Sequence, residues 1–451
     1  MLLKSFQNSF SYFVLTCLHI AFATFTFSVC WFHYYQYQMP KSWFQSDWRF
    51  PILIFLIMCA LLDQLYESFR MDLHPDKELV LSQFLASVVP HLCFYLLNVL
   101  LYFKFFNIFP FILYVVVNYG FAMLYTGIVL NKYTNPTVPR HGLIIYAKSR
   151  NLMDRLADSY LSHEFAVIEK MSINTFKRQT ANPLEGVDTL FLYGISGKNR
   201  ELIMHYCITN GIRIYTIPNV SDLLMMSGTN ANLVHLPILE VHRYDPNQLY
   251  LFIKRAFDIF VSLLGLLILW PFMLITAIAV KSDGGPAIYR QTRLTKDGKK
   301  FDILKFRSMR VDAEKDGVAR LSTGDKDNRI TNVGKVIRAI RFDELPQLFN
   351  ILKGDMTIVG PRPERPEIAE EYYTFLPEFE LRLQAKAGLT GYAQVYGQYN
   401  TTPEDKLLFD LMYIAHPSIW NDLKIMFATI KVIFMKDSTE GIAEGKTTAK
   451  S

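Results

Sequence analysis

Cysteine is scarce in this chain of 451 residues, and its placement excludes two kinds of scaffold. Only five cysteines occur. Cys17, Cys30, Cys59 and Cys93 lie inside apolar runs, which leaves Cys207 alone in a polar region. A disulfide framework or a cysteine-based zinc site would need a different pattern of spacing and surroundings. We therefore expect neither.

Charged residues are also few compared with apolar ones. They make up 20% of the chain, against 51% hydrophobic residues and 14% aromatic residues. That balance is too apolar for an ordinary soluble protein, so part of the chain is predicted to lie in a membrane. The net charge of +6 and the pI near 8.8 would suit nucleic acid, anionic lipid or a phosphorylated substrate. Charge alone does not choose among them.

Four apolar runs near the N-terminus approach the length needed to cross about 30 Å of hydrocarbon. They cover residues 11–31, 50–65, 80–103 and 108–130, and the second is the shortest. The first run lacks the small-residue cleavage site of a signal peptide. Basic residues after the fourth run, such as Lys132 and Arg140, favour the cytoplasm by the positive-inside rule. We predict a bundle of four spanning helices with both of its ends in the cytoplasm.

A further absence concerns the module over residues 141–250. Strands are predicted at 143–147, 165–169, 189–195 and 212–218, with helices at 151–162 and 198–210 between them. This alternation predicts a doubly wound, Rossmann-like α/β domain. The turn after the first strand reads YAKSRN and lacks the glycines that let a backbone approach a pyrophosphate. We interpret the module as degenerate, with a structural or regulatory role.

The apolar run over residues 254–281 allows two topologies. It is long enough to span a bilayer, yet both of its flanks are basic, with Lys254 and Arg255 before it and Lys281 after it. Pro271 inside the run removes a hydrogen bond to the Leu267 carbonyl and predicts a bend. A re-entrant helix that returns to the same face and a proline-kinked spanning helix are both consistent with these residues.

Two adjacent carboxylates precede a short apolar helix pattern in IRFDELPQLFNILKG, residues 340–354. Pro346 suits the first turn of that helix, Gly354 suits its end, and Asp343 suits its N-cap. Asp343 and Glu344 would either cap the helix or stand where a phosphate binds. Neighbours on a helix point about 100° apart, so the pair suits a nucleophile with a metal-holding or orienting partner better than a facing acid/base pair.

Basic residues gather around this pair in the sequence. Lys305 and Arg307 are predicted to share one face of a strand at 303–309, because side chains two apart point the same way. Arg338 precedes Asp343 by five positions, and Arg362 lies in the proline-rich turn GPRPERP. Each of these alone would be an ordinary surface charge, but their convergence predicts a site for an anion.

Together these motifs resemble one family. From residue 254 to 436 the chain is similar to the catalytic domain of the bacterial polyprenyl-phosphate sugar-1-phosphate transferases, the monotopic phosphoglycosyl transferases. The shared text includes KRAFDI, KFRSM, DELPQLFNILKGDM, VGPRPERP and KAGLTGYAQV. The four helices and the degenerate module resemble the family's long form. The resemblance implies that residues 254–281 are re-entrant, although the break reads LWPF where short members have a serine-proline pair.

The resemblance also implies an activity. A sugar 1-phosphate would pass from a nucleotide diphosphate sugar, a UDP-hexose, to undecaprenyl phosphate on the cytoplasmic face of the bacterial inner membrane. UMP would be released and undecaprenyl-diphosphate-sugar formed, as the first membrane step of capsule, O-antigen or exopolysaccharide synthesis. The partners would be the donor, the lipid and the bilayer, with a homodimer left open and nucleic acid not expected.

The implied site consists of six residues and a metal ion. Asp343 would be the nucleophile of a covalent intermediate and Glu344 its partner, with Mg²⁺ held at the pair. The donor phosphates would be bound by basic residues, namely Arg338 and Arg362, with Lys305 and Arg307 assisting.

The predicted organisation is a membrane α-helical bundle (1–140), a Rossmann-like α/β module (141–250), an α/β monotopic catalytic domain (251–436) with the re-entrant helix, and a polar tail (437–451). Residues 405–436 mix apolar residues with lysines, as an interfacial or an amphipathic core helix would. Two other functions stay open at this point. One is a membrane-tethered NAD-dependent nucleotide-sugar dehydratase, against which the missing glycines argue, and the other is a non-catalytic scaffold of a glycan assembly complex.

Overall fold

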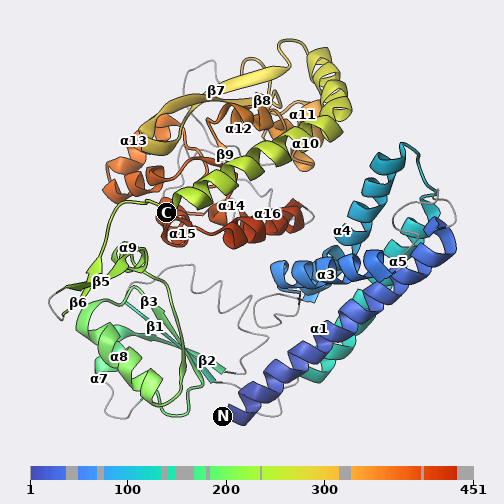
Figure 1. The fold of residues 1–451 in the computed structure, drawn as a ribbon. Coiled ribbons are helices and arrows are strands. Elements are labelled where there is room, and N and C mark those ends of the chain that lie inside the picture. Colours follow the sequence, from blue (N-terminus) through green and yellow to red (C-terminus); the bar gives the residue numbers. More distant parts are fainter. Residues whose placement is uncertain are drawn as a thin grey trace. The chain divides into compact units, whose positions relative to one another are not determined.

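The computed structural model describes residues 2–36, 49–68, 76–133, 141–147, 167–178, 183–233, 236–313, 327–397 and 401–433. The chain forms two compact units that divide between Ile217 and Pro218, and Figure 1 shows their elements. The domain boundaries at residues 140 and 250 stay predictions. The helix predicted at 151–162 and the polar tail at 437–451 lie outside the described residues.

The first unit begins with the four predicted apolar helices. These are α1 (Leu2–Cys30), α3 (Arg49–Leu65), α4 (Asp76–Tyr102) and α5 (Phe109–Tyr133), and a π-helical turn, η1 (Trp31–Tyr35), extends α1. Stretches of α1, α4 and α5 are long and apolar enough to cross a membrane, while α3 has 17 residues. Large apolar side chains such as Phe25, Val116 and Leu124 are exposed, which suits contact with hydrocarbon.

The first unit continues with a parallel sheet. Its strands are β1 (His141–Tyr146), β2 (Val167–Ser172), β3 (Thr189–Tyr193) and β4 (Arg213–Thr216), in the order β2-β1-β3-β4 with every pair parallel. Helices α7 (Ile173–Arg178) and α8 (Gly197–Thr209) accompany it. Leu143, Ile144 and Ile145 of β1 are all buried, as expected of a parallel strand covered on both faces. The parallel α/β layout is confirmed, whereas its Rossmann-like assignment stays a prediction.

The second unit opens with α9 (Val220–Met226), the antiparallel pair β5 (Thr229–Leu233) and β6 (Leu236–Glu240), and the long helix α10 (Gln248–Ser282). Helix α10 contains 35 residues and Pro271, and it is also long and apolar enough to cross a membrane. Figure 1 shows that its ribbon changes direction along its course. A proline inside a helix produces such a bend because it lacks an N–H donor.

The remaining elements follow α10 in the sequence, and one of them, η6, contains the carboxylate pair. They are the antiparallel strands β7 (Ile288–Leu294) and β8 (Lys300–Phe306) with the turn η4 (Lys296–Gly298), then α11 (Asn332–Ala339), η6 (Phe342–Glu344), α12 (Gln347–Lys353), β9 (Thr357–Val359), α13 (Pro366–Tyr373), η7 (Pro377–Gln384), β10 (Gly388–Thr390), α14 (Tyr392–Val395), α15 (Pro403–Ala415) and α16 (Ile419–Ile433). Strands β9 and β10 pair in parallel. The mixed C-terminal stretch thus forms two helices.

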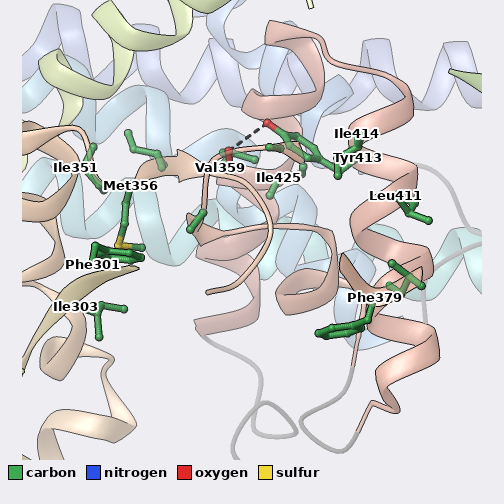
Figure 2. Packing of buried hydrophobic residues seen from close by; sticks show 14 of the residues in the cluster. Phe301, Ile303, Ile351, Met356, Val359, Phe379, Leu411, Tyr413, Ile414 and Ile425 are labelled. Atoms are coloured by element: carbon green, nitrogen blue, oxygen red, sulfur yellow. Dashed lines mark hydrogen bonds between the residues drawn. The ribbon is translucent and has the colours of Figure 1, made fainter. Parts of the chain in front are cut away.

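The hydrophobic core of the second unit includes residues of helices α12, α15 and α16 and of strand β9 (Figure 2). Ile351 of α12, Val359 of β9 and Ile425 of α16 are almost fully buried. The Tyr413 hydroxyl of α15 donates to the Val359 carbonyl at 3.1 Å, the dashed line in Figure 2. Truncation of a core residue of this kind to alanine costs about 2–5 kcal/mol. This core fixes α12, which follows the carboxylate pair, whereas Ile337 of α11, which precedes the pair, packs with Val280 and Phe306 in a separate cluster.

Candidate active site

Asp343 and Glu344 lie in η6, a single turn between α11 and α12. Arg341 precedes the turn with a left-handed φ of 58°, and the Glu344 amide donates to the Arg341 carbonyl at 3.3 Å. Helix α12 begins after its N-cap, Pro346. The prediction of Asp343 as N-cap was therefore wrong, because the left-handed residue starts a separate turn first. Gly354 ends α12 with a φ of 96°, as predicted.

The Glu344 carboxylate is held by two cations from distant segments. Lys305 Nζ of β8 lies 2.8 Å from Glu344 Oε1, and one nitrogen of the Arg362 guanidinium lies 3.4 Å from the same oxygen. Burial alone would raise the pKa of Glu344, but Lys305, Arg362 and Arg341 hold this pKa well below its usual range. Glu344 is therefore an anion at neutral pH, paired with two cations.

Asp343 differs from Glu344 in its contacts and in the direction of its pKa shift. Its side chain is 9% exposed, and within the described residues it takes part in no hydrogen bond or ion pair. Burial, together with the charge of Glu344, raises the pKa of Asp343, whereas Lys305, Arg338 and Arg341 oppose that rise. The pair thus combines a fixed anion with a second carboxylate whose oxygens are unoccupied by the described protein groups.

Arg338 lies in the last turn of α11, close enough to lower the pKa of Asp343. Arg307 is placed differently from the other predicted site residues. The residue is 6% exposed, and its guanidinium donates to the Pro286 carbonyl at 2.9 Å and the Val280 carbonyl at 2.8 Å. The face predicted to hold both Lys305 and Arg307 stops at Phe306, where β8 ends. The structure therefore brings Lys305, Arg338 and Arg362 to the pair and directs Arg307 to the end of α10.

The loop that carries Arg362 is held through its carbonyl groups, because prolines have no amide to donate. The carbonyls of Pro361, Arg362, Pro363 and Glu364 accept from the Gly388 amide at 2.9 Å, Arg382 at 2.7 Å, Arg293 at 3.2 Å and the Leu294 amide at 3.0 Å. At its base, a Cβ on Gly388 would lie 2.1 Å from the Gly360 nitrogen, so glycine is needed there. The Arg362 side chain is 44% exposed and projects from a fixed backbone.

Three further basic residues near the site were not among the predicted site residues. Arg341 is signalled only by its place two residues before Asp343. Arg293 and Arg382 both support the loop of Arg362. Their partners are distant in sequence, so no local motif reveals them.

The carboxylate oxygens of Asp343 and Glu344 are compatible with Mg²⁺ if water and substrate phosphates supply the remaining ligands. Among the described residues, no group of three or more His, Cys, Asp or Glu side chains is placed to hold a metal ion. Mg²⁺ commonly takes only one or two protein carboxylates and fills its other positions with water and substrate phosphates. The unoccupied Asp343 oxygens and the adjacent Glu344 fit that kind of site. They do not form a closed cage made of protein alone.

Comparison with known proteins matches the part of the chain that carries this site. Residues 249–436 match the family model described as bacterial sugar transferase, and this range contains every residue of the carboxylate site. The chain is 36% identical over 237 residues to the UDP-N-acetylgalactosamine-undecaprenyl-phosphate N-acetylgalactosaminephosphotransferase of Aeromonas hydrophila, covering 52% of this chain and 55% of that protein.

Two glucose-specific relatives match over the same region. The UDP-glucose:undecaprenyl-phosphate glucose-1-phosphate transferase of Klebsiella pneumoniae is 38% identical, over 49% of each chain. The protein of the same name from Caulobacter vibrioides is 40% identical over 41% of this chain and 71% of its own length. The chain spans about half the length of the Aeromonas and Klebsiella relatives. On these matches, the chain belongs to the bacterial sugar transferase family.

Proposed function

We propose that this protein transfers a sugar 1-phosphate from a UDP-sugar to undecaprenyl phosphate. The observation that carries the proposal is that Asp343, a carboxylate without a partner among the described residues, lies beside an anion, Glu344, that is bound by Lys305 and Arg362. Relatives that act on UDP-sugars and undecaprenyl phosphate, by their names, support it. These names specify different sugars, so the proposal extends to a UDP-hexose and no further.

In the proposed first step, an oxygen of the Asp343 carboxylate attacks the phosphorus that bears the sugar. The bond from that phosphorus to the bridging oxygen breaks, and UMP leaves with the electron pair. Arg338 and Arg341 lower the cost of bringing one anion to another, as their effect on the pKa of Asp343 indicates. The product is an acyl phosphate, a mixed anhydride in which the Asp343 carboxyl is bonded to the phosphorus that bears the sugar.

In the second step, a phosphate oxygen of undecaprenyl phosphate attacks the same phosphorus. The bond to Asp343 breaks and restores the carboxylate, and undecaprenyl-diphosphate-sugar is released. Dividing the reaction in this way lets the soluble nucleotide leave before the lipid phosphate enters, so two anions need not occupy the site together. Bound Mg²⁺, held by Asp343 and Glu344, would add positive charge at the diphosphate oxygens. Glu344 keeps Lys305 and Arg362 in place throughout.

The proposal includes a re-entrant α10, with the catalytic domain on the cytoplasmic face of the bacterial inner membrane. The start of α10 is bonded to the second unit through Lys254 to Asp422 at 2.9 Å and Arg255 to the Ile351 carbonyl at 2.6 Å. The end of α10 is bonded to the same unit through Arg307 and Val280. A helix that crossed about 30 Å of hydrocarbon would carry one of these charged contacts to the opposite face. The contacts at both ends thus support a return to one face.

Such a site at a membrane surface would bring a soluble donor to a lipid acceptor, the first membrane step of a surface glycan such as capsule, O-antigen or exopolysaccharide. Intact-protein mass spectrometry tests the central step. The purified protein is incubated with Mg²⁺ and each of UDP-glucose, UDP-galactose and UDP-N-acetylgalactosamine, without lipid. We expect an adduct of sugar-phosphate mass on Asp343 together with released UMP.

Two variants control this experiment. Asp343→Asn should form no adduct and lose transfer by several orders of magnitude. Asp302→Asn removes an exposed carboxylate of β8 that accepts only from Thr292 among the described contacts, and it should retain both. Full activity of Asp343→Asn, or kinetics that require both substrates bound together, would contradict the covalent mechanism. Absence of UMP release with any donor, and with lipid present, would favour the non-catalytic scaffold.

A further inference from the structure

A cluster of buried charges lies behind the loop of Arg362. It consists of Arg293, Glu364, Arg382, Lys406 and Asp410, which we call the loop anchor. The Arg382 and Asp410 side chains are 3% and 1% exposed. Burying charges at these levels is costly unless each is paired and hydrogen-bonded. Four members, Arg382 of η7, Lys406 and Asp410 of α15 and Glu364 of the loop after β9, satisfy that condition with one another, and Arg293 donates to the Pro363 carbonyl of the same loop.

Arg382 uses its planar guanidinium in several directions at once. Two of its nitrogens contact Asp410 Oδ2 at 2.8 and 2.6 Å, and a third nitrogen lies 3.8 Å from Glu364 Oε1. The guanidinium also lies 4.7 Å from the centre of the Phe379 ring. One further hydrogen bond, at 2.7 Å, reaches the backbone carbonyl of Arg362. Asp410 and Phe379 thus fix the plane of the Arg382 guanidinium. Its remaining N–H donates to the Arg362 carbonyl and so determines the position of Arg362.

We propose that Arg382 is a positioning residue, which sets Arg362 against Glu344 and thereby controls affinity for the donor diphosphate without contacting substrate. The inference rests on the proposed function. The physical basis is that the Arg362 side chain is partly exposed while its backbone carbonyl accepts a hydrogen bond from Arg382. The 3.4 Å contact between the Arg362 guanidinium and Glu344 therefore depends on that hydrogen bond. Lysine cannot replace Arg382, because a single ammonium cannot bind a carboxylate through two nitrogens and also donate to a carbonyl.

The competing explanation is that Arg382 and Asp410 form an ordinary structural ion pair. That role predicts lower stability and a smaller amount of active protein. It does not predict a selective change in donor affinity. Glu364 supports the positioning role, because it is bonded to both Arg382 and Lys406 at one end of the same loop. Burial would raise the pKa of Glu364, yet Lys406, Arg382 and Arg293 lower it to about 2, so it remains charged at neutral pH.

A double-mutant cycle tests the proposal in the full-length protein. Steady-state kinetics are measured for wild type, Arg382→Lys, Arg362→Ala and the double variant, with the UDP-sugar that the wild type uses and with undecaprenyl phosphate held saturating. We expect Arg382→Lys to raise KM for the donor about tenfold with kcat within about threefold, since a bond to a charged group is lost. In the Arg362→Ala background the same change should have no further effect on KM, because Arg382 acts through Arg362.

Two more variants keep the result decisive. Asp410→Asn retains a hydrogen-bond acceptor for Arg382 and should raise donor KM less than Arg382→Lys does; it decides the matter if Arg382→Lys does not fold. Arg243→Lys changes an exposed arginine paired with Asp297 and should leave KM unaltered. Additive effects in the cycle, or folded variants with lower Tm and unchanged donor KM, would overturn the positioning role. A wild type without transfer activity would instead refute the proposed function.

Discussion

Arg307 donates to the Val280 carbonyl oxygen at 2.8 Å and thereby joins the end of strand β8 to the last turn of α10. The same strand carries Lys305, whose ammonium contacts Glu344. Two basic residues of the motif KFRSM thus have different tasks, although they are only two positions apart. Arg307 holds the bent helix against the domain, and Lys305 holds Glu344 of the carboxylate pair.

This division predicts opposite kinetic and thermal effects for two alanine variants. Arg307→Ala leaves buried carbonyls unpaired and should lower stability by about 1–3 kcal/mol, with donor KM unchanged for the protein that remains folded. Lys305→Ala should raise donor KM and change Tm less, because its ammonium is partly exposed at the site. Thermal melts and donor titrations on both variants check this. A raised donor KM with unchanged Tm in Arg307→Ala would contradict this division and indicate that Arg307 binds the donor.

The titration of Asp343 predicts the acid limb of the pH profile. Attack requires the ionised carboxylate, and burial together with Glu344 raises the pKa of Asp343. Activity should therefore be present above this raised pKa and be lost as pH falls through it, at a higher pH than for an ordinary aspartate. Because Arg338 opposes the rise, Arg338→Gln should move the acid limb to higher pH. Profiles of kcat/KM for the two proteins measure it, and an identical limb would contradict the assignment.

The elements that sequence predicted best are those determined by local composition. The four apolar helices follow from long hydrophobic runs, and the end of α12 at Gly354 follows from a residue that tolerates a positive φ. Strands β1, β3 and β4 lie within a residue or two of the predicted stretches. In each case the residues that carry the sequence pattern are the same residues that form the structural element.

The site details that sequence reasoning missed depend on tertiary contacts. The turn of Asp343 follows from the left-handed backbone of Arg341, a non-glycine conformation that only its surroundings can impose. The partners of the Arg307 side chain depend on where β8 ends. Arg382 finds its partner Asp410 28 residues away, so no periodic pattern could pair them.

The middle module should bind no dinucleotide tightly. Its first strand, β1, is followed by a segment without glycine, while left-handed glycines occur after β3, at Gly194 with φ 63° and Gly197 with φ 62°. A pyrophosphate held in the usual way would need close backbone approach after β1. Isothermal titration of the full-length protein with NAD and NADP should show no submicromolar binding. Tight binding of either would revive the dehydratase interpretation.

Deletion of the module separates its own role from that of the catalytic site. Removing residues 141–217 removes the parallel sheet and keeps every element of the second unit. We expect the shortened protein to assemble or persist less well in the membrane and to retain transfer per folded molecule. Quantification of membrane-extracted protein alongside UMP release distinguishes the two effects. Loss of turnover in well-folded protein would place the module in the catalytic cycle.

The last prediction concerns the two ends of α10. Lys254 is largely buried against Asp422, so a cysteine there would remove this ion pair and react poorly. Gln248 and Lys281 are exposed at opposite ends of the helix and make better probes. In a background that lacks the five native cysteines, Gln248→Cys and Lys281→Cys should both react with a membrane-impermeant maleimide only after the cytoplasmic face is opened. The reason is physical: charged contacts at both ends join α10 to one folded unit, and that unit cannot stand on two sides of the hydrocarbon at once. Labelling of Lys281→Cys in intact cells, with Gln248→Cys protected, would show that α10 crosses the bilayer.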